Sequence, residues 1–162
     1  MIVVSDTSPV LSLARIGRLE LLHTLYQQVL IPTAVLEELR AGASEEASQI
    51  DVESFPWLLV ASAMDRHRVD ELRVDLDLGE AEAIVLAIER RADLLLVDER
   101  RGRRTASASG LAVTGLLGVI AQAKHEGVID AAKPLLDELM RTARFWIGPT
   151  LYAEVLVQLG EQ

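Results

Sequence analysis

Short apolar runs and segments of helical spacing follow one another along almost the whole chain. The runs that we predict as strands are 2–6, 29–31, 57–60, 94–97 and a shorter one around Ala112 and Val113. The run at 94–97 is apolar throughout, which is typical of a strand buried on both faces. Strands that alternate with helices favour a parallel sheet with helices on both sides. We therefore expect an α/β fold, with a central parallel sheet flanked by helices in a single three-layer domain over residues 1–162.

Glycines, prolines and hydroxyl residues mark where the helices begin and end. Ser8 and Pro9, after the first strand, predict a helix with Ser8 as its N-cap. Gly17 divides residues 10–26 into two short helices. The remaining segments are helices from Pro32 to Arg40 and over 79–91, 115–126, 131–143 and 149–159, a helix end with a loop over 65–78, and a polar rim helix or mobile arm over 43–56.

Composition narrows the classes of protein that fit this fold. The chain has 162 residues, half of them apolar, and a mean hydropathy of +0.25. These values exclude a disordered chain, and the apolar surplus favours a homodimer. The absence of cysteine excludes disulfide frameworks, thiol nucleophiles and zinc fingers. The N-terminal residues lack the pattern of a signal peptide and no apolar run is long enough to span a membrane, so we expect a cytoplasmic protein.

The charge balance is acidic except in one short segment. The chain has 25 acidic and 16 basic residues, and this net charge of −9 argues against nucleic-acid binding through a broadly basic surface. Eleven of the acids lie between Asp65 and Glu99. Directly after them, four positions out of five are basic: Arg100, Arg101, Arg103 and Arg104. This segment is placed to contact phosphates beside Asp98, or it is a solvated helix start whose arginines pair with neighbouring acids.

Two aspartates directly follow predicted strands. Asp6 follows the first strand, and Asp98 follows the apolar run at 94–97. In open α/β sheets, functional groups gather at the carboxyl ends of the strands, where loops leave a buried scaffold. An aspartate after a strand also serves as an ordinary turn or N-cap residue. The two aspartates together favour a shared site.

Glutamates on two predicted helices are candidates for the same site. Glu38 lies three residues after Val35 and can face the core or the solvent. Glu82 borders the apolar face of the helix at 79–91. Glu80 belongs to the first turn of that helix, where an acid also complements the helix dipole. The choice between Glu80 and Glu82 stays open.

Several converging carboxylates repel one another unless a divalent cation is bound among them. Oxygen donors suit Mg²⁺ or Mn²⁺, which keep coordination positions for water and for a phosphate oxygen, so phosphodiester hydrolysis is predicted. A zinc hydrolase is disfavoured because His23, His67 and His125 lack metal-ligand spacing. A small-molecule phosphatase is a weaker alternative, because Ser8 stands where a covalent Asp-x-Asp motif would have its second aspartate.

Four stretches of the chain together resemble the PIN-domain nucleases. They are Asp6-Thr7-Ser8, Ile31 to Leu39 (IPTAVLEEL), Gly79 to Ile84 (GEAEAI) and Leu95 to Glu99 (LLVDE). Their order is similar to that in the VapC-type toxin ribonucleases of toxin–antitoxin pairs. The stretch from Asp98 to Arg104, with Thr114 to Val119, resembles a less studied branch of predicted nucleic-acid-binding PIN-like proteins.

The resemblance implies an endoribonuclease in which metal-assisted attack of water cleaves RNA. Its catalytic and metal-binding acids would be Asp6, Glu38, Glu82 and Asp98, with Mg²⁺ or Mn²⁺ as the cofactor. Its substrate contacts would be Ser8, Arg100, Arg101, Arg103 and Arg104, and its partner a small antitoxin protein. The third acid is commonly Asp in VapC-type proteins and is Glu82 here. The alternative is a catalytically weak PIN-like module that binds nucleic acid or protein.

The aromatic residues are few and scattered, which disfavours an extended base-stacking platform. We expect all of them to lie in the core or in an interface: Tyr26, Phe55, Trp57, Phe145, Trp146 and Tyr152.

Overall fold

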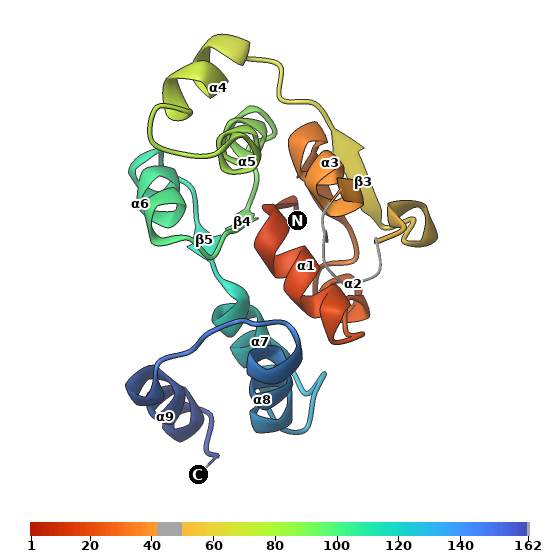
Figure 1. Cartoon of the computed structure of the whole chain (residues 1–162), viewed down its shortest axis with the longest axis vertical. Coiled ribbons are helices and arrows are strands. Elements are labelled where there is room, and N and C mark those ends of the chain that lie inside the picture. Colours follow the sequence, from red (N-terminus) through yellow and green to blue (C-terminus); the bar gives the residue numbers. More distant parts are fainter. Residues whose placement is uncertain (42–49, 162) are drawn as a thin grey trace.

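The computed structural model describes residues 1–41 and 50–161, and within them the strands form one parallel sheet (Figure 1). The strands are β1 (Val3–Ser5), β2 (Val29–Pro32), β3 (Leu58–Ala61), β4 (Leu94–Leu96) and β5 (Val113–Thr114). Their order in the sheet is β3-β2-β1-β4-β5, and every pairing is parallel. The predicted α/β fold, with helices on both sides of a parallel sheet, is confirmed.

The helices connect these strands and cover the sheet. They are α1 (Thr7–Arg15), α2 (Glu20–Tyr26), α3 (Thr33–Ala41), α4 (Arg66–Leu72), α5 (Leu78–Glu89), α6 (Arg100–Ala108), α7 (Leu116–His125), α8 (Lys133–Thr142) and α9 (Pro149–Gln158), with a short 3-10 turn η1 (Val52–Ser54). None of the helices described is long and apolar enough to cross a bilayer.

Alternate side chains of β1 enter two separate cores. Val3 packs with α1, α2, α7 and α8 on one side of the sheet, and Val4 packs with α4, α5 and α6 on the other. This follows from the two-residue period of a strand. Burial on both faces explains why the inner strands β1, β2 and β4 are mostly apolar, and the strand order places β1 at the centre of the sheet.

The chain reverses its direction of winding at β1. From β1 it builds outward through β2 to β3, and it then returns to place β4 on the opposite side of β1. Ser5 pairs with Leu96, and the Asp6 amide donates to the Leu96 carbonyl at 2.9 Å. The carboxyl ends of β1 and β4 thus lie side by side at a topological switch point, where open α/β sheets bind their ligands.

Two local predictions differ from the structure. The first helix begins at Thr7 with Asp6 in the N-cap position, so Ser8 is not the N-cap and its hydroxyl has another partner. Residues 66–72 form the helix α4, whose N-cap Asp65 accepts from the Arg68 amide at 3.1 Å. Of the segment predicted as a rim helix or arm, residues 43–49 lie outside the described residues, and η1 lies within its remainder.

Candidate functional site

Asp6 is a buried carboxylate among other acids. It follows β1 and stands before the first turn of α1, but its side chain makes no capping hydrogen bond. Only 5% of the residue is exposed. The pKa of Asp6 is raised to about 8: burial is the main cause, the hydrogen bond from the Thr7 backbone opposes the rise, and the charges of Asp77, Glu80 and Glu38 add to it. Such a group favours either a proton or a cation beside it.

Glu38 reaches the same region from α3. The Thr7 hydroxyl donates a hydrogen bond to Glu38 Oε2, which ties the end of β1 to α3. The other oxygen lies against the start of α5, where a Cβ built on Gly79 would be 2.6 Å from Glu38 Oε1. Burial raises the pKa of Glu38, the Thr7 hydrogen bond lowers it, and the charge of Asp77 raises it. Glu38 is therefore the α3 acid that faces Asp6, whereas Glu37 is exposed.

Asp98 lies after β4 and is held by two hydrogen bonds. The Ser8 hydroxyl donates to its Oδ2 at 3.0 Å, and the Leu116 amide at the start of α7 donates to its Oδ1 at 2.7 Å. Burial raises the pKa of Asp98, while these hydrogen bonds and the nearby Arg103 charge oppose the rise. Ser8 thus orients Asp98 from the first turn of α1, which gives this predicted residue a definite role.

Asp77 and Glu80 form a capping box at the start of α5. The Glu80 amide donates to Asp77 Oδ1 at 2.8 Å, and the Asp77 amide donates to Glu80 Oε2 at 3.2 Å. Glu80 is 6% exposed, and burial followed by the Asp77 charge raises its pKa. Asp77 was not among the predicted site residues. Its signal in the sequence was the Asp-x-x-Glu spacing of a capping box directly before a helix.

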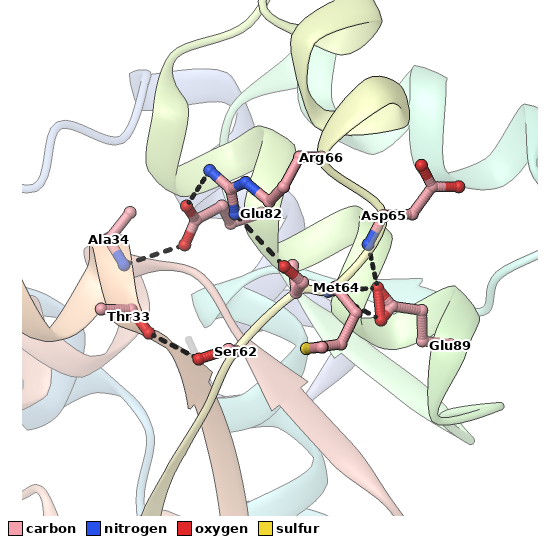
Figure 2. Close-up of polar contacts among 9 residues, drawn as sticks. Thr33, Ala34, Ser62, Met64, Asp65, Arg66, Glu82 and Glu89 are labelled. Carbon is pink, nitrogen blue, oxygen red and sulfur yellow. Dashed lines mark hydrogen bonds and ion pairs between the residues drawn. The ribbon is translucent and has the colours of Figure 1, made fainter.

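Both carboxylate oxygens of Glu82 on α5 have partners of their own (Figure 2), although its charge also raises the pKa of Glu38. Its Oε1 accepts from the Ala34 amide in the first turn of α3 at 3.0 Å, and its Oε2 pairs with the Arg66 guanidinium at 3.0 Å. Figure 2 also shows Glu89 accepting from the amides of Met64 and Asp65, before α4. Glu82 therefore joins α3, α4 and α5, and Asp6 has Asp77, Glu80 and Glu38 as its main charged neighbours.

The arginines of α6 divide between two grooves. One groove, of about 510 Å³, contains Arg101 and Arg104 together with Asp77 and Glu80. The other, of about 540 Å³, contains Arg103 together with Asp98 and Ser8, and Arg100 lines both. Arg101 also donates to the Asp75 carbonyl at 3.2 Å. The predicted substrate-binding arginines thus border the acids, on two sides of one helix.

The donor set suits a hydrated hard cation. Asp6, Glu38, Glu80 and Asp98 offer only carboxylate oxygens, the pKa of each is raised, and Asp6 is in no ion pair within residues 1–41 and 50–161. Within the same residues, no group of three or more histidine or acidic side chains is arranged to bind a metal ion together. Mg²⁺ commonly binds one or two carboxylates directly and keeps several waters, so these residues fit it without a site of three or more protein ligands.

All of these residues lie within a part of the chain that is similar to a known protein family. A family model described as a PIN domain matches residues 2–161 of the chain. No protein in the curated collection of characterised sequences matches. The matched residues include the strands β1 and β4, which Asp6 and Asp98 follow, and the helices α3 and α5, which carry the glutamates. The match extends through α9.

Proposed function

This chain belongs to the PIN-domain family, and on that premise we propose that it is a divalent-metal-dependent endoribonuclease that hydrolyses RNA phosphodiester bonds. Proteins of this family are generally nucleases. The observation that supports the proposal is a set of acids with raised pKa values: the charges of Glu38 on α3 and Glu80 on α5 act on the buried Asp6 after β1, and Asp98 follows the neighbouring strand β4. The arginines of α6 next to them supply cations for a polyanionic substrate.

The acids that we propose for the cation are Asp6, Glu38, Glu80 and Asp98. Glu80 takes the place that the sequence assigned to Glu82, because Glu80 is among the charges that act on Asp6 while both oxygens of Glu82 are engaged elsewhere. When bound, Mg²⁺ or Mn²⁺ supplies Lewis acidity toward the phosphate and toward the attacking water. The donor set and its raised pKa values support this assignment.

The hydroxyl side chains at the start of α1 position two of these acids. Thr7 donates to Glu38 and Ser8 donates to Asp98, so two neighbouring residues of one helix orient carboxylates that come from α3 and from the end of β4. The Leu116 amide holds the second oxygen of Asp98. Preorganised carboxylates need little rearrangement when substrate binds, which favours catalysis over loose binding.

The test is metal-dependent cleavage of a panel of single-stranded and structured RNAs. The wild-type chain should cleave with Mg²⁺ or Mn²⁺ and lose activity in EDTA, and Asp6→Asn and Asp98→Asn should each abolish cleavage without loss of the folded circular dichroism spectrum. Asp70→Asn is the matched control, because Asp70 is an exposed acid on α4 away from the site. Cleavage that is unchanged in both site variants would contradict the proposal.

A catalytically weak binding module is the second candidate. The observation in its favour is that no three ligating side chains gather closely within the described part of the chain. This candidate predicts RNA binding in gel-shift experiments with no cleavage by any divalent metal, and replacement of all four α6 arginines by Ala should then abolish binding. The same RNA panel therefore separates the two functions.

The toxin role rests on the resemblance to VapC-type proteins. We propose that the chain arrests growth when it is expressed alone and that a small antitoxin protein relieves the arrest. Induced expression of the wild type should stop growth, whereas Asp6→Asn should not, and equal growth of the two cultures would contradict the toxin role. A homodimer is proposed with it, and sedimentation velocity tests that assembly.

A further inference from the structure

Trp146 stands exposed in the groove that contains Asp98. The groove runs from the carboxyl ends of β1 and β4, past α6, to the loop between α8 and α9. Its lining includes Ser8, Asp98, Arg103, Arg144 and Trp146. Trp146 is 82% exposed, so of the two expected places, the core or an interface, the core is excluded. Trp57, by contrast, is buried as expected.

The loop around Trp146 is built to hold the indole outward. Arg144 follows Ala143, the C-cap of α8, and has a φ of 57°, a left-handed conformation that costs a non-glycine residue about 1–2 kcal/mol. After this turn Phe145 packs against the core and Ile147 is buried, so Trp146 between them lies on the outer side. The indole edge lies against Gly148, where a Cβ would be 3.3 Å from Trp146 Cη2. The flanking residues thus anchor an aromatic ring that itself stays open to solvent.

The charges of this groove favour a polyanion, because its guanidinium groups outnumber the two carboxylates in its lining, those of Asp98 and Glu99. Three guanidinium groups line it, those of Arg100, Arg103 and Arg144, and none of the three is in an ion pair within the described residues. Arg103 lies beside Asp98, since a Cβ on Gly115 would meet Asp98 Oδ1 at 2.9 Å and Arg103 Nη1 at 3.0 Å. Cations beside an exposed aromatic ring are the arrangement by which proteins bind the backbone and an unstacked base of a single strand.

We propose that Trp146 stacks on a base of single-stranded RNA beside the scissile phosphate, while Arg103 and Arg144 contact the adjoining phosphates. The inference rests on the proposed function, because Asp98 at one end of the groove sets where the scissile phosphate lies. The occupant is an unpaired strand, since a base within a duplex does not expose its face to an indole. Trp146 is accordingly a substrate-positioning residue and takes no part in the chemistry.

Binding is measured in an Asp6→Asn background, so that substrate is not cleaved, with a short fluorescently labelled single-stranded RNA and Mg²⁺. Trp146→Ala should weaken the affinity by roughly 5- to 150-fold, the range of one base–aromatic stack. Trp146→Phe should restore most of the affinity. Val74→Ala is the control, because Val74 is also 82% exposed but lies between α4 and α5 and should bind like the parent.

Tryptophan fluorescence supplies a second readout that a structural role would not change. The chain has two tryptophans, and Trp57 is buried. Saturation with unlabelled RNA should quench the parent strongly and should leave the emission of the Trp146→Phe variant, which comes from Trp57 alone, nearly unchanged. Arg144→Gly keeps the left-handed turn and removes the charge, so it should weaken RNA binding while the thermal unfolding midpoint stays equal or rises.

The proposal is overturned if Trp146→Ala binds RNA as tightly as the parent or if RNA leaves the emission of the parent unquenched. It is also overturned if Trp146→Ala keeps its RNA affinity and instead shifts the sedimentation coefficient, since the indole would then serve contact between two copies. Failure of the proposed nuclease activity is a separate result. It would be seen as a lack of cleavage by the wild type, with the stacking measurements unaffected.

Discussion

The carboxylate of Glu38 lies directly against the backbone of Gly79. A Cβ on residue 79 would be 2.6 Å from Glu38 Oε1, closer than two such atoms can approach. The contact crosses from α3 to the start of α5 and brings Glu38 into the field of Asp77. A glycine at this position therefore makes room for an acid of the proposed cation site.

Gly79→Ala should displace the Glu38 carboxylate and lower metal-dependent cleavage by at least about tenfold, the loss typical of a disturbed metal environment. Stability should be kept, because alanine is a better helix former than glycine and the atom that must move is the end of a flexible side chain. Cleavage rates and the urea unfolding free energy measure the two effects.

A double variant identifies the cause of that loss. If Gly79→Ala acts through Glu38, the double variant Gly79→Ala/Glu38→Gln should cleave RNA as fast as the less active of the two single variants, since both substitutions remove the same interaction. Losses that multiply would mean that Gly79 matters for another reason.

Asp6→Asn should stabilise the chain when no divalent metal is present. Burial raises the Asp6 pKa from 3.8 to about 8, so the folded state binds a proton that the unfolded state releases. The stability this proton provides is complete below pH 3.8 and is lost as the pH rises to about 8. Asparagine carries no charge at any of these values. The gain in unfolding free energy should be on the order of a few kcal/mol at pH 8 and should vanish near pH 4.

Addition of Mg²⁺ is the matched test of the same carboxylate. Ligands that bind only the folded state stabilise it by mass action, so the wild-type unfolding midpoint should rise with metal concentration while that of Asp6→Asn stays nearly constant. Urea titrations in EDTA and in Mg²⁺ give both quantities. Equal responses of the two proteins to metal would remove Asp6 from the cation site.

The acids at strand ends could be predicted because parallel strands bring their carboxyl ends to one edge. Asp6 and Asp98 follow apolar runs whose burial is evident from composition alone, and the sheet then places them together. The third acid could not be chosen this way. Glu80 and Glu82 differ by roughly 200° around α5, yet every residue from Gly79 to Ala87 is buried, so the apolar pattern gives no outward face by which to orient the helix.

The exposure of Trp146 could not be predicted from the spacing of apolar residues either. It lies in the short link between α8 and α9, where no period of two or 3.6 residues applies. Its outward position depends on the left-handed turn at Arg144 and on the burial of Phe145 and Ile147 to either side. An arginine in that conformation has no clear sequence signature, because glycine is the usual residue there.

Glu80→Gln should lower the cleavage rate, whereas Glu82→Gln should lower stability. Glutamine at 80 keeps the capping box but removes the charge next to Asp6, so cleavage should fall at least about tenfold with little change in stability. Glutamine at 82 can still accept from the Ala34 amide but weakens the pair with Arg66, which is half exposed. That variant should lose about 1 kcal/mol or less of stability and keep its cleavage rate. The reverse pattern would restore Glu82 as the third acid.

Glu161 should make the stability of the C-terminal region depend on acid pH. Its carboxylate accepts from Lys124 Nζ at 2.8 Å and from the amides of Ala132 and Lys133 at 2.8 and 3.0 Å, so it caps α8, whose own N-cap residue offers no side-chain bond. The hydrogen bond from Lys124, followed by those two amides, lowers the Glu161 pKa from 4.5 to about 2.

The stabilisation that follows from this lowered pKa is present above pH 4.5 and is lost as the pH falls toward about 2. Glu161→Gln should therefore cost about 1.5–3 kcal/mol of unfolding free energy at neutral pH, the range for hydrogen bonds to a charged group, and the difference from wild type should shrink steadily below pH 4.5. Glu154→Gln, an exposed acid on α9, is the control and should follow the wild type at every pH. A constant difference across the acid range would mean that Glu161 acts through packing and not through its charge.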